Sequence, residues 1–217
     1  YPTQTFTMTD STVSGNSASS DSATTGHHSR GGGIYIQQYT DFTATGTTFS
    51  GNSATIDAAQ ALGGALYNYI GCNITFINST FSGNSVTSDT NQSKGGAIYS
   101  VTSSSVDGSL SFRNTTITDN TSTSTSNKAW GGGSFSNSYT TLSSKSTIIS
   151  GNTVSGSTSE KGADCYGTVV SYGYNFIPYD STAGCSFDLT GLSGDDVGTD
   201  YITLPHDSLN LESTLTS

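Results

Sequence analysis

The chain has 217 residues, of which 76 are Ser or Thr and 26 are Gly, while only 10% are charged and 31% are hydrophobic. A net charge of −10 with only six Lys and Arg excludes nucleic acid as a partner and disfavours anionic membranes, because both attract basic surfaces. No apolar run is long enough to form a transmembrane segment, and the 12 Tyr, 9 Phe and many Thr indicate stacked strands rather than disorder.

A short motif repeats along most of the chain. It reads Thr-Phe-Ser-Gly-Asn-Ser at residues 48–53, and related copies stand at 12–17, 80–85, 116–121 and 148–153. The Asn residues of successive copies are 36, 32, 36 and 32 residues apart. A second motif that begins with paired Gly, such as Gly63-Gly64 and Gly95-Gly96, keeps the same phase. Each unit is therefore predicted to be one coil of a solenoid.

Apolar residues recur at two fixed positions of every unit. The two columns are Phe6, Phe42, Ile74, Leu110 and Leu142, and Val13, Phe49, Phe81, Ile117 and Ile149. Within a unit, residues alternate with period two, as in a half-buried strand. Stacked units would join these positions into continuous apolar columns that a single repeat could not bury alone. The pattern predicts an all-β parallel β-helix of about five coils, each with about three short strands.

The Asn of each unit is predicted to lie in a tight turn, because Asn tolerates left-handed backbone geometry. Stacked amides could form a hydrogen-bonded ladder of Asn16, Asn52, Asn84, Asn120 and Asn152. The alternative is that each is an ordinary turn residue. The polar segment between this Asn and the paired Gly, such as 17–30 or 121–130, is predicted to be a loop. Such loops would decorate one edge of the solenoid.

The repeat, which occupies residues 1–158, fades from residue 159. Residues 159–204 are aromatic-rich and aperiodic, and are predicted to form the last coil and a cap for the end of the solenoid. Residues 205–217 are predicted to be a polar tail. No comparable cap precedes Phe6, so the first coil is expected to be open, or covered by further sequence or another subunit.

These motifs resemble repeats of extracellular proteins. Residues 49–52 and 81–84, with 63–66 and 95–98, are similar to the paired repeat signatures of the polymorphic outer-membrane protein and autotransporter-adhesin families. Residues 148–185 resemble the choice-of-anchor surface domains. The resemblance implies a right-handed β-helix on a cell surface that serves adhesion or envelope structure.

Candidate chemistry is sparse along the chain. Asp21, Asp57 and Asp89 each follow the motif Asn by five residues, so they could stack and bind Ca²⁺ through hard oxygen ligands, or could simply open a turn. Apart from this possible Ca²⁺, no cofactor is expected. His27 and His28 are adjacent, but no further ligand completes a metal-binding pattern. No residue is predicted to be catalytic.

A stripe of aromatic residues recurs in phase with the repeat and comprises Tyr35, Tyr67 and Tyr99, with Phe135 and Tyr166. It is predicted either to face outward and bind sugar rings or a protein, or to form a core ladder.

The three Cys point to an oxidising compartment. A disulfide between Cys165 and Cys185 would close the capping segment, which leaves Cys72 unpaired or available for pairing between molecules. Five Asn residues lie in glycosylation sequons: Asn73, Asn78, Asn91, Asn114 and Asn120.

Together these features predict a secreted, non-enzymatic, structural or adhesive protein of the cell surface, either an adhesin module or the subunit of an extracellular filament. The alternatives are a carbohydrate-active enzyme, either a polysaccharide lyase or hydrolase, and a sugar-binding module on a β-helix. The expected partners are a protein or glycan at a cell surface, or a second copy in end-to-end self-association.

Overall fold

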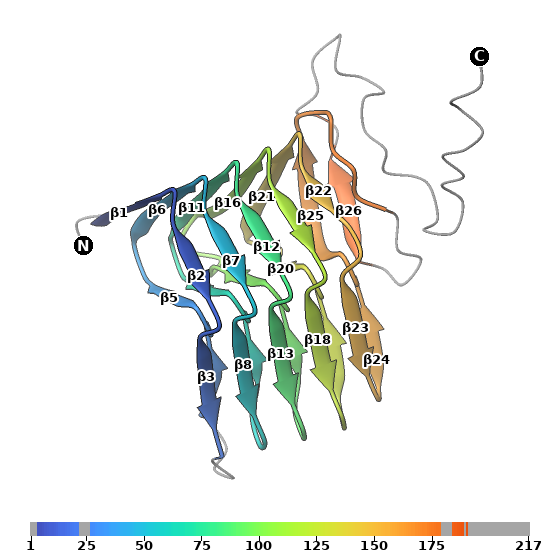
Figure 1. Ribbon diagram of the computed structural model, residues 1–217. Helices are drawn as coiled ribbons and strands as arrows, with labels where there is room; N and C mark the ends of the chain where they lie inside the picture. The colour runs from blue at the N-terminus through green and yellow to red at the C-terminus, as the bar shows by residue number, and fades with distance from the viewer. Residues whose placement is uncertain (1–3, 22–26, 179–183, 189, 191–217) are drawn as a thin grey trace, which may run out of the picture.

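The computed structural model describes residues 4–21, 27–178, 184–188 and 190, so the predicted polar tail, residues 205–217, lies outside the described part. All the described strands except the last are arranged as five stacked coils, with the same strand order in each coil (Figure 1). Every strand pairing is parallel and joins equivalent positions of neighbouring coils, for example Phe42 with Ile74 and Phe49 with Phe81. The predicted all-β parallel solenoid of about five coils is confirmed.

Four stacked sheets make up the coils. The first joins β1 (Gln4–Thr9), β6 (Thr40–Thr45), β11 (Asn73–Ile77), β16 (Gly108–Arg113), β21 (Thr140–Lys145) and β25 (Cys165–Ser171), and continues from β25 to β20 (Ser134–Ser136), β15 (Ile98–Val101), β10 (Leu66–Tyr69) and β5 (Ile34–Gln37). The second joins β2 (Thr12–Ser14), β7 (Thr48–Ser50), β12 (Thr80–Ser82), β17 (Thr116–Thr118) and β22 (Ile148–Ile149). β26 (Cys185–Asp188) pairs with β25 at the last coil.

The third and fourth sheets form an arm that the sequence did not predict. The third joins β3 (Ser17–Ser20), β8 (Ser53–Ile56), β13 (Ser85–Ser88), β18 (Thr121–Ser124) and β23 (Thr153–Gly156), and the fourth joins β4 (Ser29–Arg30), β9 (Ala61–Leu62), β14 (Ser93–Lys94), β19 (Lys128–Trp130) and β24 (Ser159–Lys161). Figure 1 shows this arm extending from one side of all five coils. The prediction of three strands per coil with a loop at one edge was therefore wrong, because the expected loop contains two further strands.

The arm holds together with small side chains. Ala54, Ile56, Ala59, Ala61 and Val86 form its own apolar cluster. Buried serines add hydrogen bonds between the two layers: the Ser88 hydroxyl donates to the carbonyl of Ala59 at 2.6 Å. Because the layers are lined by Ala and Ser, the strands approach closely and carry too little apolar area to stand out as a core pattern in the sequence.

The main core lies between the first and second sheets. Both predicted apolar columns are buried there from the second coil onward, and a third column adds Leu66 and Ile98. The first coil differs: Phe6 is 49% exposed, although its ring stacks on Phe42 at 5.3 Å. No helix in the described part of the chain is long and apolar enough to cross a membrane.

Two turn positions explain the glycine pattern. Gly63 has a φ of 66°, in the left-handed region, and a Cβ on Gly64 would collide with the backbone carbonyl of Gly96 in the next coil. The expectation of left-handed geometry at the motif Asn residues was wrong, because none of them has a positive φ. The preceding residue does: it is Gly51 in the second coil and Asp119, with φ 58°, in the fourth.

Candidate binding site

Two columns of side chains face each other along the line where the arm meets the first sheet, and this line is here called the notch. One wall is the aromatic ladder, which comprises Tyr35, Tyr67, Tyr99, Phe135 and Tyr166 on β5, β10, β15, β20 and β25. The other wall is the arm column, which comprises Arg30, Leu62, Lys94, Trp130 and Lys161 on β4, β9, β14, β19 and β24. Cation–ring and ring–ring contacts between the walls show that the two columns face each other.

The rings of the ladder stack along the solenoid axis. The Tyr67 and Tyr99 ring centroids are 5.3 Å apart with planes 7° from parallel, and those of Phe135 and Tyr166 are 4.9 Å and 2° apart. The side chains point out of the main core, since their neighbours Leu66 and Ile98 point in. The ring faces are nevertheless occupied: Tyr67 is only 2% exposed, whereas Tyr35 at the open end is 43% exposed. Tyr67 is therefore closed to a ligand, whereas Tyr35 at the open end of the ladder is accessible.

The notch collects most of the chain's positive charge. Four of the six Lys and Arg lie here. The guanidinium of Arg30 lies 5.2 Å from the centroid of the Tyr67 ring. The ammonium groups of three lysines lie near the indole of Trp130, at 5.0 Å for Lys94, 5.3 Å for Lys128 and 5.6 Å for Lys161. Across the described residues, none of these four cations pairs with a carboxylate.

Burial in the notch shifts the pKa values of a lysine and of two tyrosines. It lowers the pKa of the Lys94 ammonium, and the neighbouring charge of Lys128 lowers it further. Burial raises the pKa of the Tyr99 phenol to about 12, and it also raises the pKa of the Tyr67 phenol, although the nearby Arg30 charge opposes both shifts. The site thus holds crowded cations beside neutral aromatic side chains.

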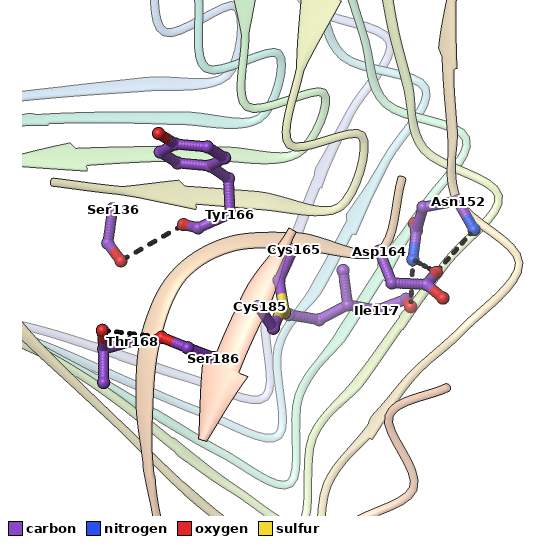
Figure 2. The surroundings of a disulfide bond; sticks show 9 residues. All are labelled: Ile117, Ser136, Asn152, Asp164, Cys165, Tyr166, Thr168, Cys185 and Ser186. Atoms are coloured by element: carbon purple, nitrogen blue, oxygen red, sulfur yellow. Dashed lines mark hydrogen bonds between the residues drawn. A yellow bond between two sulfur atoms is a disulfide. The ribbon is translucent and has the colours of Figure 1, made fainter. Parts of the chain in front are cut away.

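A cavity of about 730 Å³ opens at the C-terminal end of the notch. Trp130, Phe135 and Tyr166 form its aromatic side, and hydroxyl and amide groups from β20, β25 and β26 line the rest. Figure 2 shows the Tyr166 ring on one side of β25 and the disulfide of Cys165 on the other. The volume lies within the usual range for small-molecule sites.

The disulfide of Cys165 and Cys185 supports one wall of this cavity. It joins β25 to β26, with the two Cα atoms 5.4 Å apart. The hydroxyls of Thr168 and Ser186 are 2.9 Å apart across the same pair of strands. Cys72 is free and fully buried in the main core, where burial raises the pKa of its thiol.

The motif asparagines form a continuous hydrogen-bonded ladder inside the turns. Each side-chain amide donates to the next Oδ1, for example Asn52 to Asn84 at 2.9 Å and Asn84 to Asn120 at 2.9 Å. The ladder ends at Asp164, whose carboxylate accepts from the backbone and side-chain nitrogens of Asn152 (Figure 2). Asp164 could not be recognised from the sequence, because its copy of the glycine motif, Gly162-Ala163, lacks the second Gly.

Asp21, Asp57 and Asp89 follow the paired strands β3, β8 and β13 in successive coils, and all three are exposed at the end of the arm. No three His, Cys, Asp or Glu side chains in the described segments form a group that could hold a metal ion. The Nδ1 of His28 accepts a hydrogen bond from the backbone of Gln60, while His27 is exposed.

The five sequon asparagines differ in their exposure. Asn73, Asn78 and Asn114 are exposed, and Asn91 is partly buried. Asn120 is fully buried and donates to Asn152 and to the carbonyl of Phe81, so a glycan cannot be attached there in the folded chain. The prediction of glycosylation at Asn120 was therefore wrong for the folded chain.

The arm column is the part of the site that the sequence analysis overlooked. Its members directly precede the glycine motif in all five units, so the phased repeat already contained the signal. Lys128 joins them because it is two residues from Trp130 on the same strand and therefore shares its face.

The family model of the Chlamydia polymorphic membrane protein repeat matches residues 46–69 and 78–101. These segments run through β7–β10 and β12–β15, and each contains one motif Asn and one paired Gly. The resemblance to polymorphic membrane protein repeats is thus confirmed for the second and third coils. No curated protein and no solved structure matches the chain.

Proposed function

We propose that this chain is an adhesive module displayed at a cell surface, and that it acts by binding rather than by catalysis. The observation that carries the proposal is the placement of two polymorphic membrane protein repeats in adjacent coils of one solenoid. The family description names a membrane protein, which supports display at the cell envelope.

The physical character of the surface supports the same function. A solenoid presents one extended face built from equivalent positions of many coils, which suits binding to large partners. The Ser- and Thr-rich exterior and the low charge favour an extracellular module, and the disulfide fits an oxidising compartment.

Antibody and protease access on intact cells tests the display. We expect an antibody against the folded chain to label intact producing cells, and external protease to remove that label while a cytoplasmic marker stays intact. Labelling that appears only after lysis would contradict the proposal.

A second candidate, the subunit of an extracellular filament, is favoured by the first coil. Phe6 is 49% exposed there, and β1 pairs only with β6 among the described strands. An exposed ring beside a free strand edge can accept another chain. Sedimentation of the purified chain should then show concentration-dependent association that Phe6→Asp abolishes, and a monomer at all concentrations would exclude this candidate.

A further inference from the structure

We propose that the C-terminal end of the notch, with its adjoining cavity, binds an acidic glycan, that is, a saccharide that carries carboxylate or sulfate groups. The proposal rests on the proposed function only for the setting at a cell surface, and it names the ligand class of that adhesive face.

Three lysines at this end of the notch carry positive charge that no described carboxylate neutralises. Lys94, Lys128 and Lys161 place three ammonium groups within 5.6 Å of the centroid of one indole, in a chain of net charge −10. Like charges gathered around one indole repel, as the lowering of the Lys94 pKa by Lys128 indicates, and no carboxylate in the described part of the chain pairs with them. The nearest acidic residue in sequence, Glu160, alternates to the opposite side of β24 and accepts from the backbone of Gly156. An external anion would relieve this repulsion and form charge-assisted hydrogen bonds.

Two neighbouring aromatic rings, those of Trp130 and Tyr166, form the second part of the proposed site. Trp130 lies parallel to the Tyr166 ring at 5.4 Å, and both rings line the cavity. Aromatic side chains combine apolar contact area with a polar edge, which suits the apolar face and hydroxyl rim of a pyranose ring. The ladder itself cannot accept such stacking at Tyr67, which is covered on both faces by Tyr35 and Tyr99.

Polar side chains line the same cavity. Ser136, Asn137, Thr168 and Ser186 present hydroxyl and amide groups beside the rings. A few convergent polar groups in a mostly apolar cavity fix the orientation of a ligand that has many hydroxyls. Trp130 lines this cavity and also has the three lysine ammonium groups near its ring, so cations, aromatic rings and hydroxyls are neighbours at this end of the notch. An acidic saccharide is the ligand that uses all three.

The single Trp of the chain provides a direct readout, because Trp130 is part of the proposed site. The full purified chain would be titrated with three oligosaccharides of matched length: an oligogalacturonate, a heparin oligosaccharide and a neutral malto-oligosaccharide. We expect a saturable change in Trp fluorescence with at least one acidic saccharide, weakened by added salt, and none with the neutral one. The two acidic arms distinguish carboxylate from sulfate as the bound anion.

A charge-matched pair of variants assigns the effect to the notch. The double variant Lys128→Gln, Lys161→Gln removes two cations and leaves polar side chains that are slightly shorter, and should weaken acidic-saccharide binding about tenfold or more. The control Arg113→Gln, Lys145→Gln removes the same number of positive charges at two exposed, paired positions on β16 and β21, and should bind like wild type.

Several results would overturn the inference. They are the absence of binding by both acidic saccharides, equal binding of the neutral saccharide, equal losses in the two double variants, and tighter binding of an acidic peptide such as oligoglutamate. Surface labelling of intact cells is independent of these titrations. A displayed chain that binds no acidic saccharide refutes the inference alone, and a chain that binds one but is not displayed refutes the proposed function alone.

Discussion

Asn84 shows how one buried side chain links three coils. Its Nδ2 donates to the Oδ1 of Asn120 at 2.9 Å and to the carbonyl of Phe49 at 2.9 Å, and its Oδ1 accepts from the backbone nitrogen of Asn52 at 3.0 Å. Asn84 is fully buried, and a buried polar group without a hydrogen-bond partner is costly. The ladder therefore satisfies the polar groups of the turns without water.

We expect Asn84→Ala to lower the free energy of unfolding by about 3 kcal/mol, because it leaves the carbonyl of Phe49 and the amide of Asn52 without partners. Urea unfolding of the purified chain measures this. Asn16→Ala is the matched control: Asn16 is exposed at the end of the ladder, and its loss should cost less than about 1 kcal/mol. Equal losses would show that the ladder is an incidental feature of the turns.

The buried phenol of Tyr99 predicts alkaline sensitivity. Its pKa is about 10 in an unfolded chain and about 12 in the folded chain, so the folded state holds the proton more tightly. The resulting stability is fully present below pH of about 10 and is lost as the pH rises from about 10 to about 12. Tyr99→Phe should therefore flatten the decline in unfolding free energy over this window. A variant with the same slope as wild type would contradict the assignment.

Among single elements, the turns that precede β5, β10, β15 and β20 depend on paired glycines. We expect Gly64→Ala to destabilise the fold strongly, by about 3 kcal/mol or more, since a Cβ there meets the carbonyl of Gly96 and neither backbone can move without opening the coils.

Gly51→Asp is the control for that substitution. Gly51 also has a positive φ, but its Cβ would meet open space, and Asp119 already occupies the equivalent position of the fourth coil. The variant should cost about 1 kcal/mol or less, as measured by urea unfolding. A similar loss for both variants would mean that backbone conformation, rather than close approach, explains the paired glycines.

The strand β26 is fastened to the last coil by the disulfide of Cys165 and Cys185. The two Cys are separated by 20 residues in the sequence, and cross-links that close loops of about this length contribute about 3 kcal/mol in the chain-entropy model. We expect reducing agent to lower the unfolding free energy of wild type by about that amount. It should have no effect on the double variant Cys165→Ala, Cys185→Ala, which retains only the buried Cys72 thiol. A reductant effect that persists in the double variant would argue against this pairing.

The arm marks the limit of what could be predicted from sequence. The phased columns of Phe42 and Phe49 predicted the main core, because large apolar residues recur there in every coil. The strands β3 and β4 could not be recognised, because their inward residues are Ala18 and Ser29, which are common in loops as well. The direction of the aromatic ladder was also ambiguous, since alternation alone does not say which residues the arm will cover.

For the whole molecule, five coils add their equivalent positions into long surfaces of one kind. The turns form an amide ladder, and the notch gathers aromatic rings and four cations. The remaining exterior is rich in Ser and Thr and low in charge. An extended face that differs so strongly from the rest of the surface is suited to the proposed attachment.

Attachment of the folded chain to cells can be measured directly. Beads coated with the folded, disulfide-bonded chain would be compared on cultured cells with beads carrying the same chain unfolded by reduction and alkylation in urea. We expect saturable attachment of the folded-chain beads that soluble folded chain competes away, and background attachment of the unfolded-chain beads. Equal attachment of both, or attachment that soluble folded chain does not reduce, would contradict the claim that the stacked coils form an adhesive surface.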